Sequence, residues 1–323
     1  MIVTPRKARL NAAVSLVAAL GLFLGIALFT TIILPPNLVT WLWTLPPAAA
    51  AAALVFFFMT RKYRRRRKIA SEPFPAAWET ILKTRVAFYN TLSEQEQEHF
   101  RLEIAIFIDE KRITGIKTEV DDATRLLVAA SAVIPIFGFP EWEYDGLGEI
   151  LIYPSSFDDE YRFTKGRNIL GVVHSGGPLS SIMILSKPDL HDGYTHATDK
   201  LNVGIHEFAH ILDRADGAVD GIPATLDRAL ARPWLDLVHE KMNEIAEGRS
   251  DIRPYALKNE QEFFAVVSEY FFENPQKLKA EHPRLYDMLE TIFKQDMASR
   301  VTSCLAQVLF PYGRRIGRNA PCP

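Results

Sequence analysis

Positions 206 to 210 hold two histidines four residues apart, with a glutamate directly after the first of them. Side chains at this spacing lie on the same face of a helix, one turn apart. His206 and His210 can therefore bind one metal ion, while Glu207 can reach water at that ion. The pattern predicts a zinc-dependent peptidase. The competing interpretation is a pair of hydrogen-bonded core histidines beside a solvent-exposed glutamate.

A hydrolytic zinc site needs a third protein ligand and keeps a fourth position open for water. The spacing after His210 lacks the further histidine of a metzincin, which excludes that class. A glutamate from a separate helix is the other common solution, and residues 259–272 have an apolar helical pattern in which Glu262 and Glu269 share a face. Glu262 could instead complete a capping box with Asn259. On chemistry alone the candidates are His239, His282, Asp213, Asp216, Asp220, Glu260, Glu262 and Glu269.

At these residues the chain resembles the Mlc titration factor A family of zinc-dependent peptidases. The catalytic domain of anthrax lethal factor is similar to a shorter part of the same pattern. The likeness covers roughly residues 75 to 297. It rests on HEFAHILD from His206, RPYA around Tyr255, NEQEFFAVVSEYFF around Glu262, PRLY from Pro283, Gln295-Asp296, and the upstream segments from Glu149 and Val173.

This resemblance implies that His206, His210 and Glu262 bind Zn²⁺ and that Glu207 is the general base. It also implies that Tyr255 stands beside the metal, where its phenol would donate a hydrogen bond to the oxyanion of the tetrahedral species. Histidines that bind metals usually donate their other ring nitrogen to a carboxylate or carbonyl. Asp213 and Glu269 are our candidates for that supporting role.

The family name suggests an alternative in which the protein sequesters a cytoplasmic transcriptional regulator, with peptidase activity secondary or absent. Glu207 favours the enzyme, because a structural zinc ion has no use for a general base. A membrane-remodelling or lipid-binding protein would explain the N-terminal segment described next, but not the candidate metal site. The expected partners are therefore a peptide or protein substrate, a regulator protein and a lipid bilayer.

No charged residue occurs between Arg9 and Arg61, which is too long an apolar stretch for a signal peptide. Two transmembrane helices, at about 11–34 and 39–59, fit this stretch, with prolines in the connecting turn. Lys and Arg flank the pair on both outer sides and are missing from the turn. The positive-inside rule then places both ends, and the catalytic domain, on the cytoplasmic side of a bacterial inner membrane.

Residues 1–70 carry ten basic and no acidic residues, while the rest of the chain carries 27 basic and 39 acidic residues, a net charge of −12. A domain of that charge repels phosphate backbones, so no nucleic acid is expected as a partner. The basic cluster from Arg61 to Lys68 directly follows a span and is expected to contact anionic lipid headgroups. Cys304 and Cys322 cannot form a disulfide framework, which suits a reducing cytoplasm.

The expected fold class is α+β and helix-dominated: a zincin-like metallopeptidase domain with a small sheet, preceded by two transmembrane helices. We expect a membrane anchor at 1–70, a zinc peptidase domain at 71–298 and a tail at 299–323 with an incomplete SEC-C-like motif. By analogy, Ile182 to Ser186 should be the edge strand that pairs with an extended peptide. Helices are predicted at 75–92, 93–111 (with a Ser93–Glu96 capping box), 121–134, 200–213, 225–246, 259–272 and 283–295, and strands at 150–153, 169–173 and 182–185.

Overall fold

A computed structural model describes residues 5–156, 171–173, 181–196 and 199–302. The chain divides into two compact units, Met1–Pro73 and Phe74–Pro323. The predicted SEC-C-like motif and both cysteines lie outside the described residues, as do the first two residues of the strand predicted at 169–173.

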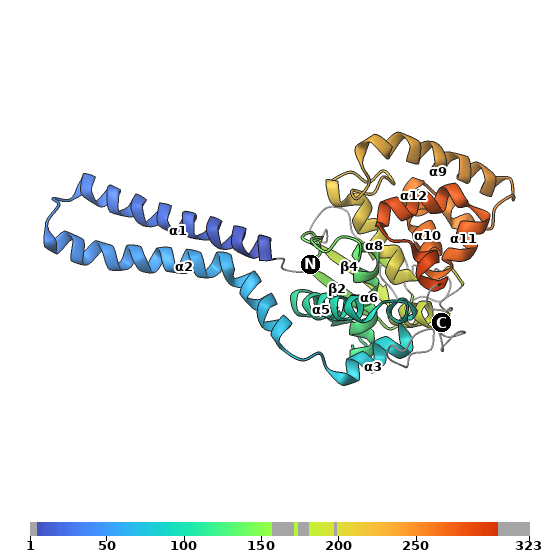
Figure 1. Ribbon diagram of the computed structural model, residues 1–323, viewed down its shortest axis with the longest axis horizontal. Helices are drawn as coiled ribbons and strands as arrows, with labels where there is room; N and C mark the ends of the chain where they lie inside the picture. Colours follow the sequence, from blue (N-terminus) through green and yellow to red (C-terminus); the bar gives the residue numbers. More distant parts are fainter. Residues whose placement is uncertain (1–4, 157–170, 174–180, 197–198, 303–323) are drawn as a thin grey trace. The chain divides into compact units, whose positions relative to one another are not determined.

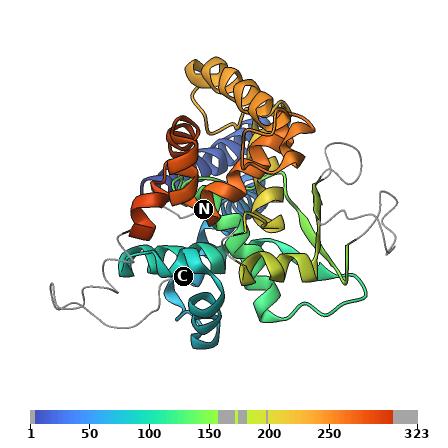
Figure 2. The same ribbon diagram turned by 90° about the vertical axis from the view of Figure 1, so that its right-hand side faces the viewer.

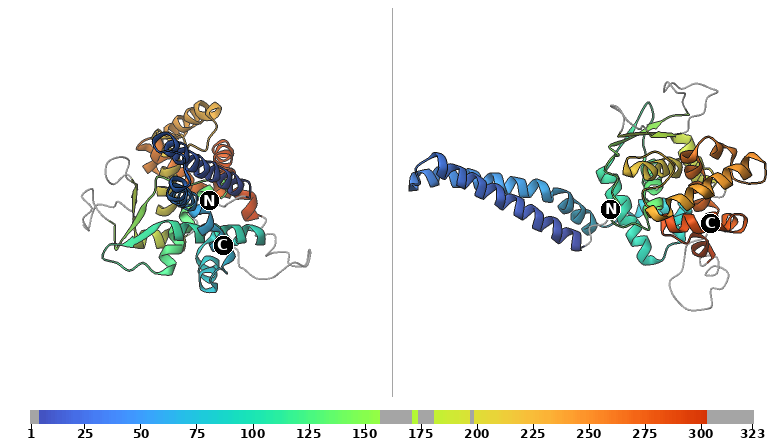
Figure 3. Two further views of the ribbon diagram at one scale, coloured as in Figure 1. Left: turned by 90° about the vertical axis from the view of Figure 1, so that its left-hand side faces the viewer. Right: turned by 90° about the horizontal axis from the view of Figure 1, so that it is seen from above.

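The N-terminal unit is a hairpin of two long helices, α1 (Pro5–Ile33) and α2 (Leu38–Ser71) (Figures 1 and 3). Asn37 caps α2 by accepting a hydrogen bond from the Thr40 backbone N–H at 2.9 Å. Both helices are long and apolar enough to cross a membrane, which confirms the prediction of two apolar N-terminal helices. Since α2 continues beyond its predicted end at residue 59 to Ser71, the basic cluster from Arg61 to Lys68 is itself helical.

The second unit contains a four-stranded sheet in the order β1-β2-β4-β3. Strands β1, β2 and β4 run parallel, and β3 pairs antiparallel with β4. The strands are β1 (Arg112–Gly115), β2 (Glu149–Tyr153), β3 (Gly171–Val173) and β4 (Ile182–Ser186). Together with the surrounding helices this sheet confirms the α+β, helix-dominated fold class.

The prediction that Ile182 to Ser186 forms an edge strand is wrong. β4 pairs with β2 on one side and with β3 on the other, so β1 and β3 are the outer strands of the described sheet. The run Met183, Ile184 and Leu185 is buried throughout, as is typical of a strand that is covered on both faces. Burial of the faces does not reveal whether a strand pairs on one side or on both, so the sequence pattern could not identify the second neighbour.

Most predicted helices are present with shifted ends. Ser93 and Glu96 form the predicted capping box at the start of α5. The helix predicted at 75–92 is divided at Val86, whose backbone is extended. The helices involved, with two that were not predicted (α7 and α11), are α3 (Ala76–Arg85), α4 (Ala87–Asn90), α5 (Glu94–Glu110), α6 (Asp122–Ile136), α7 (Lys187–Thr195), α8 (Val203–Asp213), α9 (Ala231–Ala246), α10 (Glu260–Glu273), α11 (Pro275–Glu281) and α12 (Pro283–Phe293).

Helix α8 lies between the strands of the sheet and α10, and it also packs against α6 (Figures 1 and 2). Gly204 allows this close approach, because a Cβ at that position would lie only 2.7 Å from Cβ of Ser131 on α6. Buried Phe263, Phe264 and Phe271 hold α10 against the rest of the core. The two helices that carry the predicted ligands are therefore fixed against one another by packing.

Candidate metal centre

The structure brings His206, His210 and Glu262 together although they come from two helices. Oε2 of Glu262 on α10 lies 3.1 Å from Nε2 of His206 and 3.5 Å from Nε2 of His210, both on α8. The possible ligand atoms of the three side chains all lie within 4.8 Å of one another. Two imidazole nitrogens and one carboxylate oxygen form a donor set that zinc accepts. The side chains of His206, His210 and Glu262 are 13%, 21% and 11% exposed, so solvent reaches the cluster.

The N-caps of the two helices set this arrangement. The Asn202 side chain accepts a hydrogen bond from the Ile205 N–H at 3.0 Å and starts α8 just before His206. The Asn259 side chain accepts from the Glu262 N–H at 2.8 Å and starts α10. The Glu262 side chain does not complete a capping box. Its carboxylate points to the histidines instead.

Glu207 is almost fully buried, with 4% of its surface exposed. Burial raises the pKa of its carboxyl group, an effect that the neighbouring His206 and His210 partly oppose. A carboxylate with a raised pKa can take up a proton more readily near neutral pH than an exposed glutamate can. This is the property that a general base needs.

Glu269 lies behind His206. Its Oε1 accepts a hydrogen bond from Nδ1 of His206 at 2.8 Å, and its Oε2 accepts one from the Asn202 N–H at 2.6 Å. The Arg253 guanidinium also donates to Oε1. Glu269 thus orients the ring so that Nε2 faces Glu262, which is the supporting role expected from its position seven residues after Glu262.

Asp213, the other candidate for that role, behaves differently. It is fully buried at the end of α8, and neither carboxylate oxygen has a hydrogen-bond partner in the described part of the chain. Burial and the nearby Asp220 raise its pKa to about 6. Asp213 therefore does not orient His210 through a hydrogen bond.

Glu262 divides its two carboxylate oxygens between different partners. Oε2 faces the histidines, whereas Oε1 accepts hydrogen bonds from Nζ of Lys258 at 2.7 Å and from the hydroxyl of Tyr255 at 3.3 Å. Burial alone would raise the pKa of Glu262, but the hydrogen bonds from His206, His210 and Lys258 hold it well below its ordinary value. Glu262 is therefore ionised at neutral pH, as a ligand must be.

The hydrogen bonds to Glu262 and Glu269 also change the pKa of His206. Burial on its own would lower the pKa of the imidazole, but hydrogen bonds to Glu262 and Glu269 raise it well above its ordinary value. A cation that binds at Nε2 must therefore displace a proton from this ring. Glu207 lies close enough to the His206 ring to interact with it electrostatically.

Tyr255 stands at the edge of the cluster, with its hydroxyl next to Oε1 of Glu262. It belongs to the short 3-10 helix η4 (Pro254–Leu257), and 49% of its surface is exposed. Sequence reasoning missed Lys258 and Arg253, which reach the cluster from the same turn. The four-residue spacing from Lys258 to Glu262 was a signal that could have identified the first of them.

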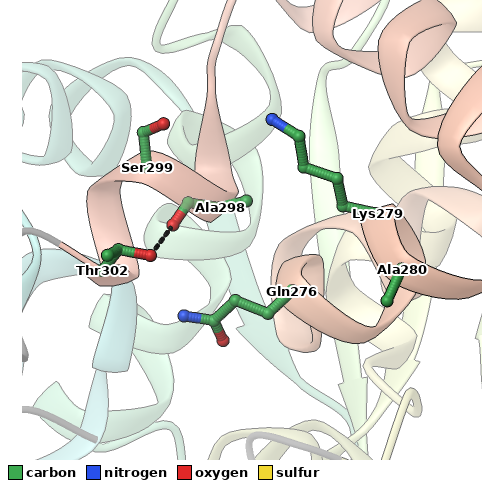
Figure 4. A pocket seen from close by; sticks show the side chains of 6 residues that line it. All are labelled: Gln276, Lys279, Ala280, Ala298, Ser299 and Thr302. Carbon is green, nitrogen blue, oxygen red and sulfur yellow. Dashed lines mark hydrogen bonds between the residues drawn. The ribbon is translucent and has the colours of Figure 1, made fainter.

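Two hollows in the described part of the molecule lie away from this cluster. One, of about 460 Å³, is lined by residues of α11 and of the segment after α12, and its walls include Gln276 and Lys279 (Figure 4). The other, of about 490 Å³, lies at the amino ends of β1, β2 and β4. Neither contains a residue of the candidate metal centre.

Residues 60–294 match the model of the glucose-regulated metallo-peptidase M90 family. An uncharacterized protein of Synechocystis sp. is 30% identical over 70% of this chain and 86% of its own length. Mlc titration factor A of Salmonella typhimurium is 31% identical over 67% of this chain and 85% of its own length. The protein of that name from Pectobacterium atrosepticum is 28% identical over 66% and 84%, respectively.

Proposed function

This chain belongs to the family of glucose-regulated M90 metallopeptidases, and on that premise we propose that it is a zinc-dependent peptidase anchored in the bacterial cytoplasmic membrane. The observation that carries the proposal is the position of Glu262, whose Oε2 lies within 3.5 Å of Nε2 of both histidines. Because the two histidines and the glutamate come from different helices, this convergence is a property of the fold rather than of one helical turn.

His206, His210 and Glu262 would hold the zinc ion. When bound, zinc supplies Lewis acidity, which polarises a peptide carbonyl and makes water a better nucleophile at neutral pH. Glu207 takes the proton of the attacking water and then delivers it to the leaving amine. Its burial supports this role, because the raised pKa lets the carboxyl group hold the proton between the two steps.

Tyr255 and Glu269 complete the proposed mechanism. The Tyr255 hydroxyl lies 3.3 Å from Oε1 of Glu262 and is close enough to the ligands to donate a hydrogen bond to a developing oxyanion. Glu269 keeps the His206 ring oriented through Nδ1. Zinc fits this donor set better than calcium or magnesium, which take oxygen ligands.

The anchoring part of the proposal rests on α1 and α2, each long and apolar enough to span a bilayer. The basic cluster from Arg61 to Lys68 directly follows the apolar part of α2. Positive charge on that side supports an orientation in which the peptidase unit faces the cytoplasm. The same residues are suited to bind anionic lipid headgroups.

A second function is binding of a regulator protein, which the name of the Mlc titration factor A relatives suggests. Glu207 supports the enzymatic function, because a buried carboxylate with a raised pKa costs stability and a binding surface has no use for it. Pull-down from a bacterial lysate with the wild type and with Glu207→Gln separates the two. Capture of the same protein by both forms supports binding without catalysis.

The experiment that tests the enzymatic function uses the full-length chain in detergent and a degenerate peptide library. We expect cleavage that a chelator abolishes and that one equivalent of zinc restores. Cleavage that persists after complete removal of metal would contradict the proposal, as would a zinc-loaded chain that leaves every peptide intact.

A further inference from the structure

Lys258 lies directly beside the candidate metal centre. It directly follows η4, and its Nζ lies 2.7 Å from Oε1 of Glu262 and 3.4 Å from the Tyr255 hydroxyl. Its side chain is 57% exposed, whereas that of Glu262 is only 11% exposed. The ammonium group has three N–H donors, so these two contacts leave it with donor capacity towards solvent.

The contacts of Glu262 determine what this ammonium group will do when the centre is loaded. Lys258 and Tyr255 share Oε1, while Oε2 faces the two histidines. A divalent cation bound by the two histidines and Glu262 would share the negative charge of this carboxylate with Lys258. Lys258 would then lose part of the charge compensation that Glu262 provides in the absence of the cation.

The other charged groups around the centre differ from Lys258 in their partners or in their exposure. Arg253 is paired with Glu269, whose carboxylate also receives His206. Glu207 is buried and interacts most strongly with the histidines. Of Arg253 and Lys258, only Lys258 is highly exposed and also pairs with a proposed metal ligand, Glu262.

We propose that Lys258 is a specificity-determining residue that binds a carboxylate of the peptide next to the scissile bond. This inference rests on the proposed peptidase function and names the substrate class: peptides with Asp, Glu or a terminal carboxylate adjacent to the bond that is cleaved. The proposed preference concerns only the carboxylate next to the scissile bond. The chain beyond residue 70 carries a net charge of −12, so acidic peptides in general gain nothing from long-range attraction.

A purely structural role for Lys258 makes a different prediction. Exposed ion pairs at i, i+4 spacing contribute little to stability, and removing one leaves substrate choice unchanged. Lys83 offers a matched control, because it forms an i, i+4 pair with Glu79 at 2.8 Å and is 42% exposed. Lys83→Gln removes the same kind of charge from a different part of the same unit.

The first assay measures cleavage. Zinc-loaded, full-length wild type, Lys258→Gln, Lys258→Arg and Lys83→Gln are each incubated with a degenerate peptide library, and mass spectrometry counts Glu against Gln at each position around the cleaved bonds. We expect the wild type and Lys83→Gln to prefer Glu over Gln about five- to tenfold at one adjacent position. Lys258→Gln should lose this preference, and Lys258→Arg should keep most of it.

The second assay measures binding without turnover. Fluorescent libraries that differ only in a fixed Glu or Gln are titrated against two zinc-loaded proteins. One is the Glu207→Gln variant, and the other carries both Glu207→Gln and Lys258→Gln. Tighter binding of the Glu library that disappears with Lys258→Gln supports the inference. Equal binding of both libraries, or a preference that survives Lys258→Gln, overturns it.

The two assays separate the inference from the proposed function. If the wild type cleaves no peptide, the peptidase function fails, while the binding assay still decides whether Lys258 recognises a carboxylate. If the wild type cleaves peptides with no preference for Glu at any position, the peptidase function stands and the inference is overturned.

Discussion

Glu269 accepts a hydrogen bond from Nδ1 of His206 at 2.8 Å, on the ring nitrogen opposite to the one that faces Glu262. This contact sets both the tautomer and the orientation of an imidazole ring that would otherwise rotate about its side-chain bonds. The same carboxylate also binds the backbone N–H of Asn202, so one side chain on α10 positions both the N-cap and the first histidine of α8.

Glu269→Gln is the first prediction. His206 and Asn202 bond to different oxygens of Glu269, and glutamine replaces one of these oxygens by an NH2 group that cannot accept a hydrogen bond. Either the His206 ring or the start of α8 then loses its support, so zinc affinity should fall about 10- to 100-fold. Competition with a chromophoric chelator measures the change. Glu260→Gln is the control, because Glu260 lies on the same helix and pairs with His239 at 3.1 Å instead. Equal affinity in wild type and Glu269→Gln would remove Glu269 from the account.

Glu262→Ala should lose metal rather than only activity. Without its carboxylate the two histidines form an incomplete donor set, and elemental analysis of the purified chain should find far less than one zinc ion per molecule. Glu260→Ala should keep full occupancy. A fully occupied Glu262→Ala would move the third ligand to another residue.

Tyr255→Phe removes the hydroxyl group of Tyr255 and keeps its aromatic ring. The hydroxyl lies 3.3 Å from Glu262 and is proposed to stabilise the oxyanion, so kcat should fall about 100-fold with an unchanged zinc content. Steady-state kinetics with a peptide from the library measure this. An unchanged kcat would mean that Tyr255 acts only as a neighbour of Glu262.

Gly204→Ala should destabilise the peptidase unit. The added Cβ would lie 2.7 Å from Cβ of Ser131 and force α8 away from α6, at a cost of about 1–3 kcal/mol. Thermal unfolding of the full chain in detergent measures the loss. Gly146→Ala is the control, because a Cβ there meets no atom within 4 Å. Equal melting temperatures for the two variants would contradict the close packing of these helices.

The raised pKa of Glu273 should make the stability of the peptidase unit depend on pH. Burial, followed by the charges of Glu269 and Asp199, raises its pKa from 4.5 to about 8. Between these values the unfolded chain releases the proton while the folded chain keeps it, so this contribution to stability falls as the pH rises from 4.5 to 8. Glu273→Gln removes this dependence. Its melting temperature relative to wild type should therefore be higher at pH 8 than at pH 5, and a constant difference would show that Glu273 is ionised throughout.

Parts of this site could be predicted from sequence because they depend on helical periodicity. The spacing from His206 to His210, and from Glu262 to Glu269, puts each pair on one face of a helix whatever the rest of the fold does. The helix-dominated α+β class followed from the same periodicity and from three short β-branched runs.

Other parts depend on contacts that periodicity does not contain. Arg253 and Lys258 reach the site because the chain turns through η4 before α10 begins. The place of β4 within the sheet depends on its pairing with β3. The break between α3 and α4 falls at Val86, a buried residue with an extended backbone. Asp213 had the expected spacing from His210, but its carboxylate is not hydrogen-bonded to the ring.

The central claim is that two imidazoles and a carboxylate hold one zinc ion at which Glu207 moves the proton. Parallel measurement of zinc content and peptide hydrolysis in wild type and Glu207→Gln tests it most directly. The account predicts one zinc ion per chain in both proteins and a rate of hydrolysis about a thousandfold lower in the variant. Hydrolysis by Glu207→Gln at the wild-type rate, or an active wild type that contains no metal, would contradict it.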